Sequence, residues 1–90
     1  MLVARRYVIG GRVQRVGFRD FTATAAVREG VTGWVRNLPD GRVGIVAEGA
    51  VDAVERFERD IRQGPRGARV DDVQATQTPR SGRHAGFSIR

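Results

Sequence analysis

The chain contains no cysteine and no lysine, and it has only one histidine and one tryptophan in its 90 residues. Without cysteine, disulfides, thiolate metal sites and a cysteine nucleophile are excluded. A small domain that needs no disulfide fits a reducing compartment. No apolar run approaches the ~18 residues of a membrane span, and residues 1–10 lack the continuous apolar stretch of a signal peptide. We therefore expect a cytoplasmic protein with no membrane partner.

Positive charge is in excess, because 16 arginines face 10 acidic residues and the net charge is +6. Arginine suits flat, two-pronged contacts to phosphate or carboxylate, although an arginine-only set also arises from genomic composition. The charge indicates an anionic partner, either a small phosphorylated molecule or a nucleic acid. A stacking platform for bases needs exposed aromatic residues. Most of the six aromatics, Trp34 included, fall at expected core positions, so we expect no nucleic-acid partner.

The hydrophobic pattern predicts one domain spanning residues 1–90, of the α+β class. Strands are expected at residues 3–13, 32–37, 42–48 and 68–75, with a bulge at 70–73 and a short closing strand at 86–90. Helices are expected at residues 19–29 and 51–63. The order βαββαβ, with one extra short strand, predicts a ferredoxin-like sandwich in which two helices cover one face of an antiparallel sheet.

Several hydrolytic sites are missing from the sequence. No His–Asp–Ser set is present for a covalent route, and His84, in a Gly/Arg/Ser loop, is expected to be solvated. The nearest approach to a metal site is Asp71-Asp72, but adjacent residues of a strand point to opposite faces. We expect neither a metal nor a cofactor.

A glycine-containing loop between a strand and a helix remains, within Gly11–Arg19. The first amides of a helix have no intrahelical acceptor and can bind an anion. Arg19 falls where its guanidinium could close over that anion. Asn37 ends a strand before the turn Pro39-Asp40-Gly41. From these residues alone, a surface turn with arginines and a turn-forming asparagine are the favoured interpretations.

Both segments resemble signatures of the acylphosphatase family. Gly11-Arg12-Val13-Gln14-Arg15-Val16-Gly17-Phe18-Arg19 is similar to G-x-V-Q-G-V-x-F-R, and residues 33–49, which begin Gly-Trp-Val-Arg-Asn, are similar to the second signature. The two occur in the family's order and spacing, and the resemblance covers nearly the whole chain. Arg15 stands where the signature usually has glycine, and a backbone with positive φ would be strained there; an Arg15 side chain directed to solvent is expected.

The resemblance implies hydrolysis of acyl phosphates to a carboxylate and inorganic phosphate without a metal ion. Arg19 and Asn37 would be the catalytic side chains, with Asn37 orienting the attacking water. The phosphoryl group would be bound by the loop residues Gln14, Arg15, Val16, Gly17, Phe18 and Arg19. Inorganic phosphate or sulfate would compete for that loop, and we expect a monomer.

Two alternatives exist within the family. Similar domains occur inside a larger hydrogenase-maturation protein, for which carbamoyl phosphate is the presumed substrate, and a family-like domain can lose its activity. The length of 90 residues and the presence of both Arg19 and Asn37 favour a stand-alone, active enzyme.

Overall fold

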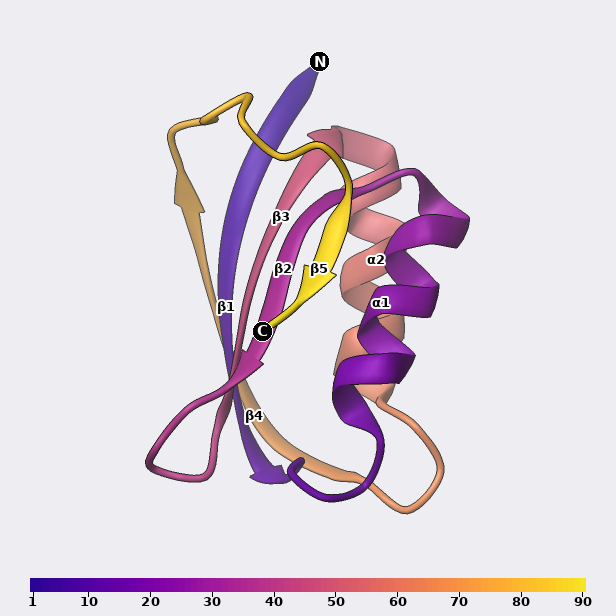
Figure 1. Ribbon diagram of the computed structural model, residues 1–90, viewed down its shortest axis with the longest axis vertical. Helices are drawn as coiled ribbons and strands as arrows, with labels where there is room; N and C mark the ends of the chain where they lie inside the picture. Colours follow the sequence, from indigo (N-terminus) through magenta and orange to yellow (C-terminus); the bar gives the residue numbers. More distant parts are fainter.

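One sheet forms the body of the molecule, and two helices cover one of its faces (Figure 1). The structure, a computed structural model, describes all 90 residues. The elements along the chain are β1 (Leu2–Arg12), α1 (Phe18–Glu29), β2 (Thr32–Asn37), β3 (Val43–Ala50), α2 (Val51–Gln63), β4 (Arg69–Thr78) and β5 (Phe87–Ile89). Neither helix is long and apolar enough to cross a membrane.

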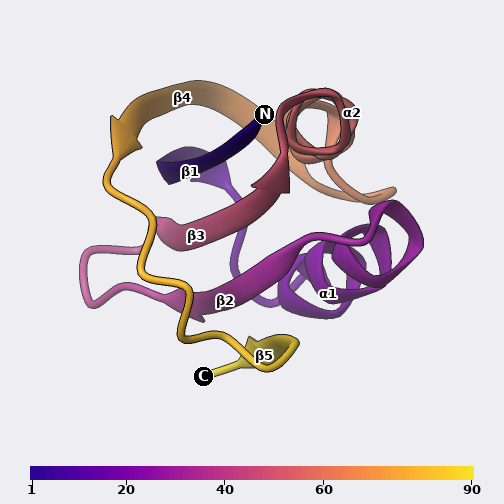
Figure 2. The same ribbon diagram turned by 90° about the horizontal axis from the view of Figure 1, so that it is seen from above.

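The strand order is β4-β1-β3-β2-β5, so the expected α+β ferredoxin-like fold is confirmed. Four strands pair antiparallel, but β5 runs parallel to β2, which makes the sheet mixed rather than purely antiparallel. The direction of β5 follows from the path of residues 79–86, which cross one end of the sheet before β5 begins (Figure 2). The predicted bulge is also confirmed, because Gly10 pairs with Asp72 and Gly11 with Val70, which leaves Asp71 as the extra residue.

The core lies between the helices and the covered face of the sheet. On α2 the predicted apolar stripe supplies Val54, Phe57 and Ile61, all fully buried, while Val51 at the helix start is half-buried. On α1 the buried side chains are smaller, apart from Phe18: Thr22, Ala25 and Ala26. Small residues let α1 lie close to the sheet, and this fixes the position of the loop that precedes it.

Trp34 does not lie in the core, contrary to expectation. The next residue of β2, Val35, is fully buried under the helices, and alternation along a strand therefore turns Trp34 to the opposite, open face. The indole is half-buried there, beneath the guanidinium groups of Arg36 and Arg90.

His84 is not solvated either. Its Nε2 lies 2.9 Å from Oε2 of Glu48, and its side chain is only 18% exposed. Glu48, buried on β3, also accepts hydrogen bonds from the Ser81 hydroxyl at 2.7 Å and from the amides of Ser81 and Gly82 at 3.0 and 3.2 Å. This carboxylate holds the segment between β4 and β5 on the sheet, which explains why a histidine in a polar loop is covered.

Candidate active site

A pocket of about 160 Å³ lies where the loop after β1 meets the start of α1, the end of β2 and the end of β5. It brings Arg19 and Asn37 together, as the sequence predicted, although they belong to different elements. Its walls are Val13, Arg15, Gly17, Phe18, Arg19, Asp20, Asn37 and Ile89.

The floor of the pocket is formed by the start of α1. Gly17 precedes the helix in a left-handed conformation, with φ 77°, and no side chain caps the helix. The first helical hydrogen bond runs from the Phe21 amide to the Gly17 carbonyl at 3.0 Å. The amides of residues 18–20 precede that bond, so they are free to donate to an anion.

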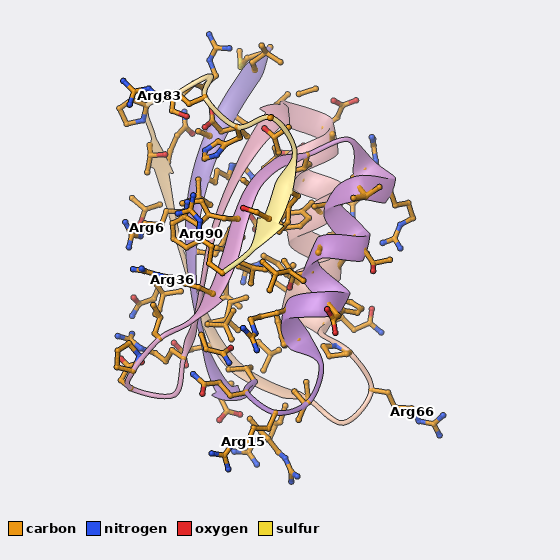
Figure 3. The ribbon with its side chains drawn as sticks, in the orientation of Figure 1. Arg6, Arg15, Arg36, Arg66, Arg83 and Arg90 are labelled. Atoms are coloured by element: carbon orange, nitrogen blue, oxygen red, sulfur yellow. The ribbon has the colours of Figure 1, made fainter.

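Arg15 is the one non-glycine residue of the chain with a positive φ, of 62°. The backbone at this position therefore has the conformation that glycine adopts without cost, and arginine adopts it at a cost of roughly 1 kcal/mol. The exposed side chain of Arg15 leaves the loop on the solvent side of the pocket, as expected (Figure 3). Arginine in place of glycine thus raises the conformational energy of the loop backbone, but its side chain does not fill the pocket.

Arg19 has no acidic side chain as a partner. Its Nη1 donates to the main-chain oxygen of Arg90 at 3.2 Å, and no Asp or Glu side chain lies within ion-pair distance. By contrast, Arg5, Arg28, Arg42, Arg56, Arg62 and Arg69 all pair with acidic groups. A guanidinium without an acidic side-chain partner, beside free helix amides, is a suitable site for a phosphoryl group.

Asn37 carries the chain's one buried side-chain polar atom without a hydrogen-bond partner, its Oδ1. Buried polar atoms are nearly always hydrogen-bonded, because desolvation without a partner costs free energy. Since Asn37 also lines the pocket, its amide oxygen is placed to accept a hydrogen bond from a small molecule there.

Two of the predicted phosphate-binding residues, Gln14 and Val16, are absent from the pocket wall. Gln14 uses its side-chain amide to bind the hairpin between β2 and β3, and Val16 packs on the core. Conversely, sequence analysis did not identify Val13, Asp20 and Ile89 as site residues. Val13 and Asp20 could have been predicted, because they lie next to or within the loop and the helix start. Ile89 is placed at the pocket by the parallel pairing of β5 with β2, and no sequence pattern indicates that pairing.

Charge next to the site is balanced at the hairpin. A side-chain hydrogen bond from Arg42, together with one from its backbone amide, lowers the pKa of Asp40. The Arg42 guanidinium lies 2.7 Å from Oδ2 of Asp40. Arg42 therefore adds little to the field in the pocket, whereas Arg15 and Arg19, which line it, pair with no acidic side chain.

Comparison with known proteins identifies the family. The acylphosphatase family profile matches residues 5–89. An acylphosphatase of Rubrobacter xylanophilus is 51% identical over 85 residues, which cover 94% of this chain and 77% of that protein. One of Pseudomonas aeruginosa is 50% identical over 82 residues, covering 91% and 89% of the two chains.

Solved structures agree. The crystal structure of an acylphosphatase from Bacillus subtilis superposes with a TM-score of 0.94 at 39% identity, covering 100% of this chain and 99% of that one. A full-length HypF in a phosphate- and nucleotide-bound form contains a similar domain, with a TM-score of 0.92 and 31% identity over 12% of its length. The profile, the relatives and the structures coincide over the segments that build the pocket, and the chain belongs to the acylphosphatase family of enzymes that hydrolyse acyl phosphates.

Proposed function

We propose that the chain cleaves the carboxyl–phosphate bond of acyl phosphates without a metal ion, with Arg19 binding the phosphoryl group and Asn37 orienting the attacking water. The observation that carries the proposal is the convergence, in one pocket, of a guanidinium without an acidic side-chain partner, free helix amides and a buried amide oxygen without a partner. The buried amide oxygen is the costliest of these groups in a purely structural role.

Binding of the phosphoryl group uses the charge of Arg19 and the amides of residues 15–19. A guanidinium makes two parallel hydrogen bonds to phosphoryl oxygens, and the amides at the start of α1 add donors and a favourable helix dipole. The carbonyl of Arg90 holds the Arg19 side chain near this position before substrate arrives. Inorganic phosphate, a product, fits the same donors and is expected to compete.

Attack requires a water in line with the bond that breaks. The buried Oδ1 of Asn37 accepts a hydrogen bond from that water, and the amide NH₂ can donate one to it or to a phosphoryl oxygen. This fixes the direction in which a water lone pair points at phosphorus. Asn37 lies at the end of β2, paired with Val43, so the rigid sheet holds the amide in place.

The leaving group explains why so few groups suffice. A carboxylate has a conjugate acid of pKa ~4, so it departs without a general acid, and phosphoryl transfer depends mainly on positioning and charge stabilisation. No three His, Asp or Glu side chains converge anywhere in the chain to hold a metal. The one carboxylate at the pocket, Asp20, lacks the companion ligands that a divalent ion needs.

The test is benzoyl phosphate hydrolysis with inorganic phosphate as inhibitor, in the presence and absence of a chelator. Wild-type activity is expected to survive chelation. Arg19→Ala is expected to lose nearly all activity and phosphate inhibition while remaining folded, and Arg19→Lys to bind phosphate weakly, because an ammonium cannot make the two-pronged contact. Arg66→Ala, at an exposed arginine between α2 and β4, is the matched control. Activity that depends on a divalent ion, or unchanged phosphate inhibition in Arg19→Ala, contradicts the proposal.

A further inference from the structure

The face of the sheet that the helices leave open carries the chain's single tryptophan among arginines. The guanidinium carbons of Arg36 and Arg90 lie 5.2 and 5.0 Å from the centre of the Trp34 ring. Figure 3 shows Arg6, Arg36 and Arg90 gathered on this side of the sheet. None of the three lies within ion-pair distance of a carboxylate. We call Arg6, Trp34, Arg36 and Arg90 the open-face patch.

Strand register places these side chains in a line. Trp34 pairs with Val46 on β3, and Val46 pairs with Arg6 on β1, so Arg6 and Trp34 stand two strands, or roughly 10 Å, apart on the same face. The line continues to Thr76 on β4 and to Ser88 on β5. An aromatic ring, a cation and two hydroxyls therefore cross the open face of the sheet.

The acidic side chains of this face stand at its ends. Glu48 is already engaged by Ser81, Gly82 and His84. Asp72 lies against Gly10 near the bulge, where a Cβ built on that glycine would meet the carboxylate. The middle of the face thus has positive charge with no internal compensation, and an anionic ligand complements it.

We propose that the open-face patch binds single-stranded nucleic acid, with a base stacked on Trp34 and the neighbouring phosphates on Arg6 and Arg36. An indole beside guanidiniums on an open sheet has the features that a base and its backbone require. A base reaches the ring by displacing one of the two guanidiniums, which then turns to a phosphate. The expectation of no nucleic-acid partner rested on most of the aromatics, Trp34 included, being in the core, and for Trp34 that premise is wrong.

Trp34 reports on its own site, because it is the only tryptophan. The probe is an oligothymidylate of about ten nucleotides, within the range of single-strand site sizes. We expect saturable quenching of the intrinsic fluorescence, and a salt dependence of log K with a slope of about −0.7 for each phosphate contacted. Anisotropy of a labelled oligonucleotide then measures the variants. Trp34→Leu is expected to bind roughly 5- to 100-fold more weakly.

Arginine variants separate this site from the rest of the molecule. Arg6→Gln and Arg36→Gln are each expected to weaken binding about fivefold at 0.1 M salt and to reduce the slope by about 0.7. Both are expected to hydrolyse benzoyl phosphate at the wild-type rate, because neither lines the catalytic pocket. The control Arg66→Gln removes the same charge away from the patch and is expected to bind like wild type.

Four results would each overturn the proposal: no binding at low salt, an equal loss in Arg66→Gln, wild-type affinity in a folded Trp34→Leu variant, or inorganic polyphosphate or anionic vesicles binding as tightly as the oligonucleotide. The last two outcomes indicate attraction by charge alone, without a stacked base. Hydrolysis of benzoyl phosphate tests the catalytic pocket independently, so failure of one assignment leaves the other intact.

Discussion

The side chain of Gln14 is hydrogen-bonded to the backbone of Leu38, its Nε2 lying 2.8 Å from the Leu38 carbonyl oxygen. The same nitrogen donates to the carbonyl of Arg42 at 3.0 Å, and the Leu38 amide closes the hairpin on that carbonyl at 2.8 Å. Leu38 directly follows Asn37. One amide group therefore joins the loop after β1, the proposed phosphate-binding loop, to the strand end that carries the proposed water-orienting residue.

Replacing Gln14 with leucine is expected to lower kcat about tenfold, because misplacing a catalytic group by a fraction of an ångström reduces turnover strongly. Two carbonyls also lose their donor, so the free energy of unfolding is expected to fall by about 1–3 kcal/mol. Phosphate inhibition is expected to change less than kcat. The control is Gln77→Leu, at an exposed glutamine on β4. A folded Gln14→Leu variant with wild-type kcat shows that the link has no catalytic role.

Asn37→Ala is expected to separate function from stability. Turnover of benzoyl phosphate is expected to fall on the order of 10²–10³-fold, as for other preorganised polar groups, with a nearly unchanged phosphate inhibition constant. Because the variant removes a buried oxygen that has no partner in the protein, the midpoint of urea unfolding is expected to stay level or rise. A folded variant with full activity argues against water orientation, and a large loss of stability argues for a turn-forming role.

Asn37→Asp is a separate probe of charge. It preserves the size of the side chain but places an anion beside the phosphoryl site. Both kcat and phosphate inhibition are therefore expected to weaken, in contrast to Asn37→Ala. Competition between phosphate and benzoyl phosphate, measured for both variants at one pH, distinguishes the two. Equal inhibition constants in the two variants mean that the Asn37 side chain lies too far from the phosphate to affect its binding.

Arg15→Gly is expected to stabilise the fold by about 0.5–1 kcal/mol, since glycine adopts the φ of 62° at this position without steric cost. For a domain of this size, that gain raises Tm by roughly 2–8 °C. Arg15→Ala is the matched variant, because it removes the same charge and keeps the strained conformation. Differential scanning calorimetry is expected to place Arg15→Gly above both Arg15→Ala and wild type, and equal Tm values for the two variants would show that no strain is released.

Glu48 is expected to make stability depend on acid pH. Burial raises the pKa of this carboxyl, but hydrogen bonds from Ser81 and the Gly82 amide and the charge of His84 outweigh burial and lower it below 4.5. A lowered pKa in the folded state gives stability that is present above the unfolded pKa and is lost as pH falls through the folded value.

Urea unfolding of wild type and Glu48→Gln, followed between pH 7 and pH 3, measures this contribution. The two proteins are expected to differ most near neutral pH and to converge in acid, because the carboxyl is then protonated in both states. Other acidic groups titrate in the same range, so the difference between the two curves is the relevant quantity. A difference that is constant with pH contradicts the assignment.

Sequence patterns predicted the parts of the fold that depend on local periodicity. The stripe Val54–Phe57–Ile61 defines α2 because one helical face must be buried, and the irregular spacing of residues 70–73 marks the bulge that leaves Asp71 unpaired. The two catalytic candidates were found because their signatures bracket the elements that meet at the pocket. Both side chains line one pocket, and their roles as site residues stay predictions.

Features set by distant segments could not be predicted in this way. Trp34 is expected in the core, but the helices cover the face of β2 that carries Val35, so Trp34 lies on the open face. His84 is covered only because Glu48, far away in the chain, anchors its loop. The unpartnered oxygen of Asn37 likewise could not be predicted from the sequence, because it depends on the absence of a hydrogen-bond donor on the surrounding elements.

The shortest strand has a consequence for motion at the site. β5 has three residues and pairs with β2 alone, so few hydrogen bonds hold it, and such edges open locally at a small fraction of the global unfolding free energy. Each opening withdraws Ile89 from the pocket wall and the Arg90 carbonyl from Arg19. The guanidinium can then reorient while the central strands β1 and β3 stay intact. Amide exchange that is fast in β5 and slow in β3 would indicate that the orientation of Arg19 fluctuates with the fraying of one edge strand.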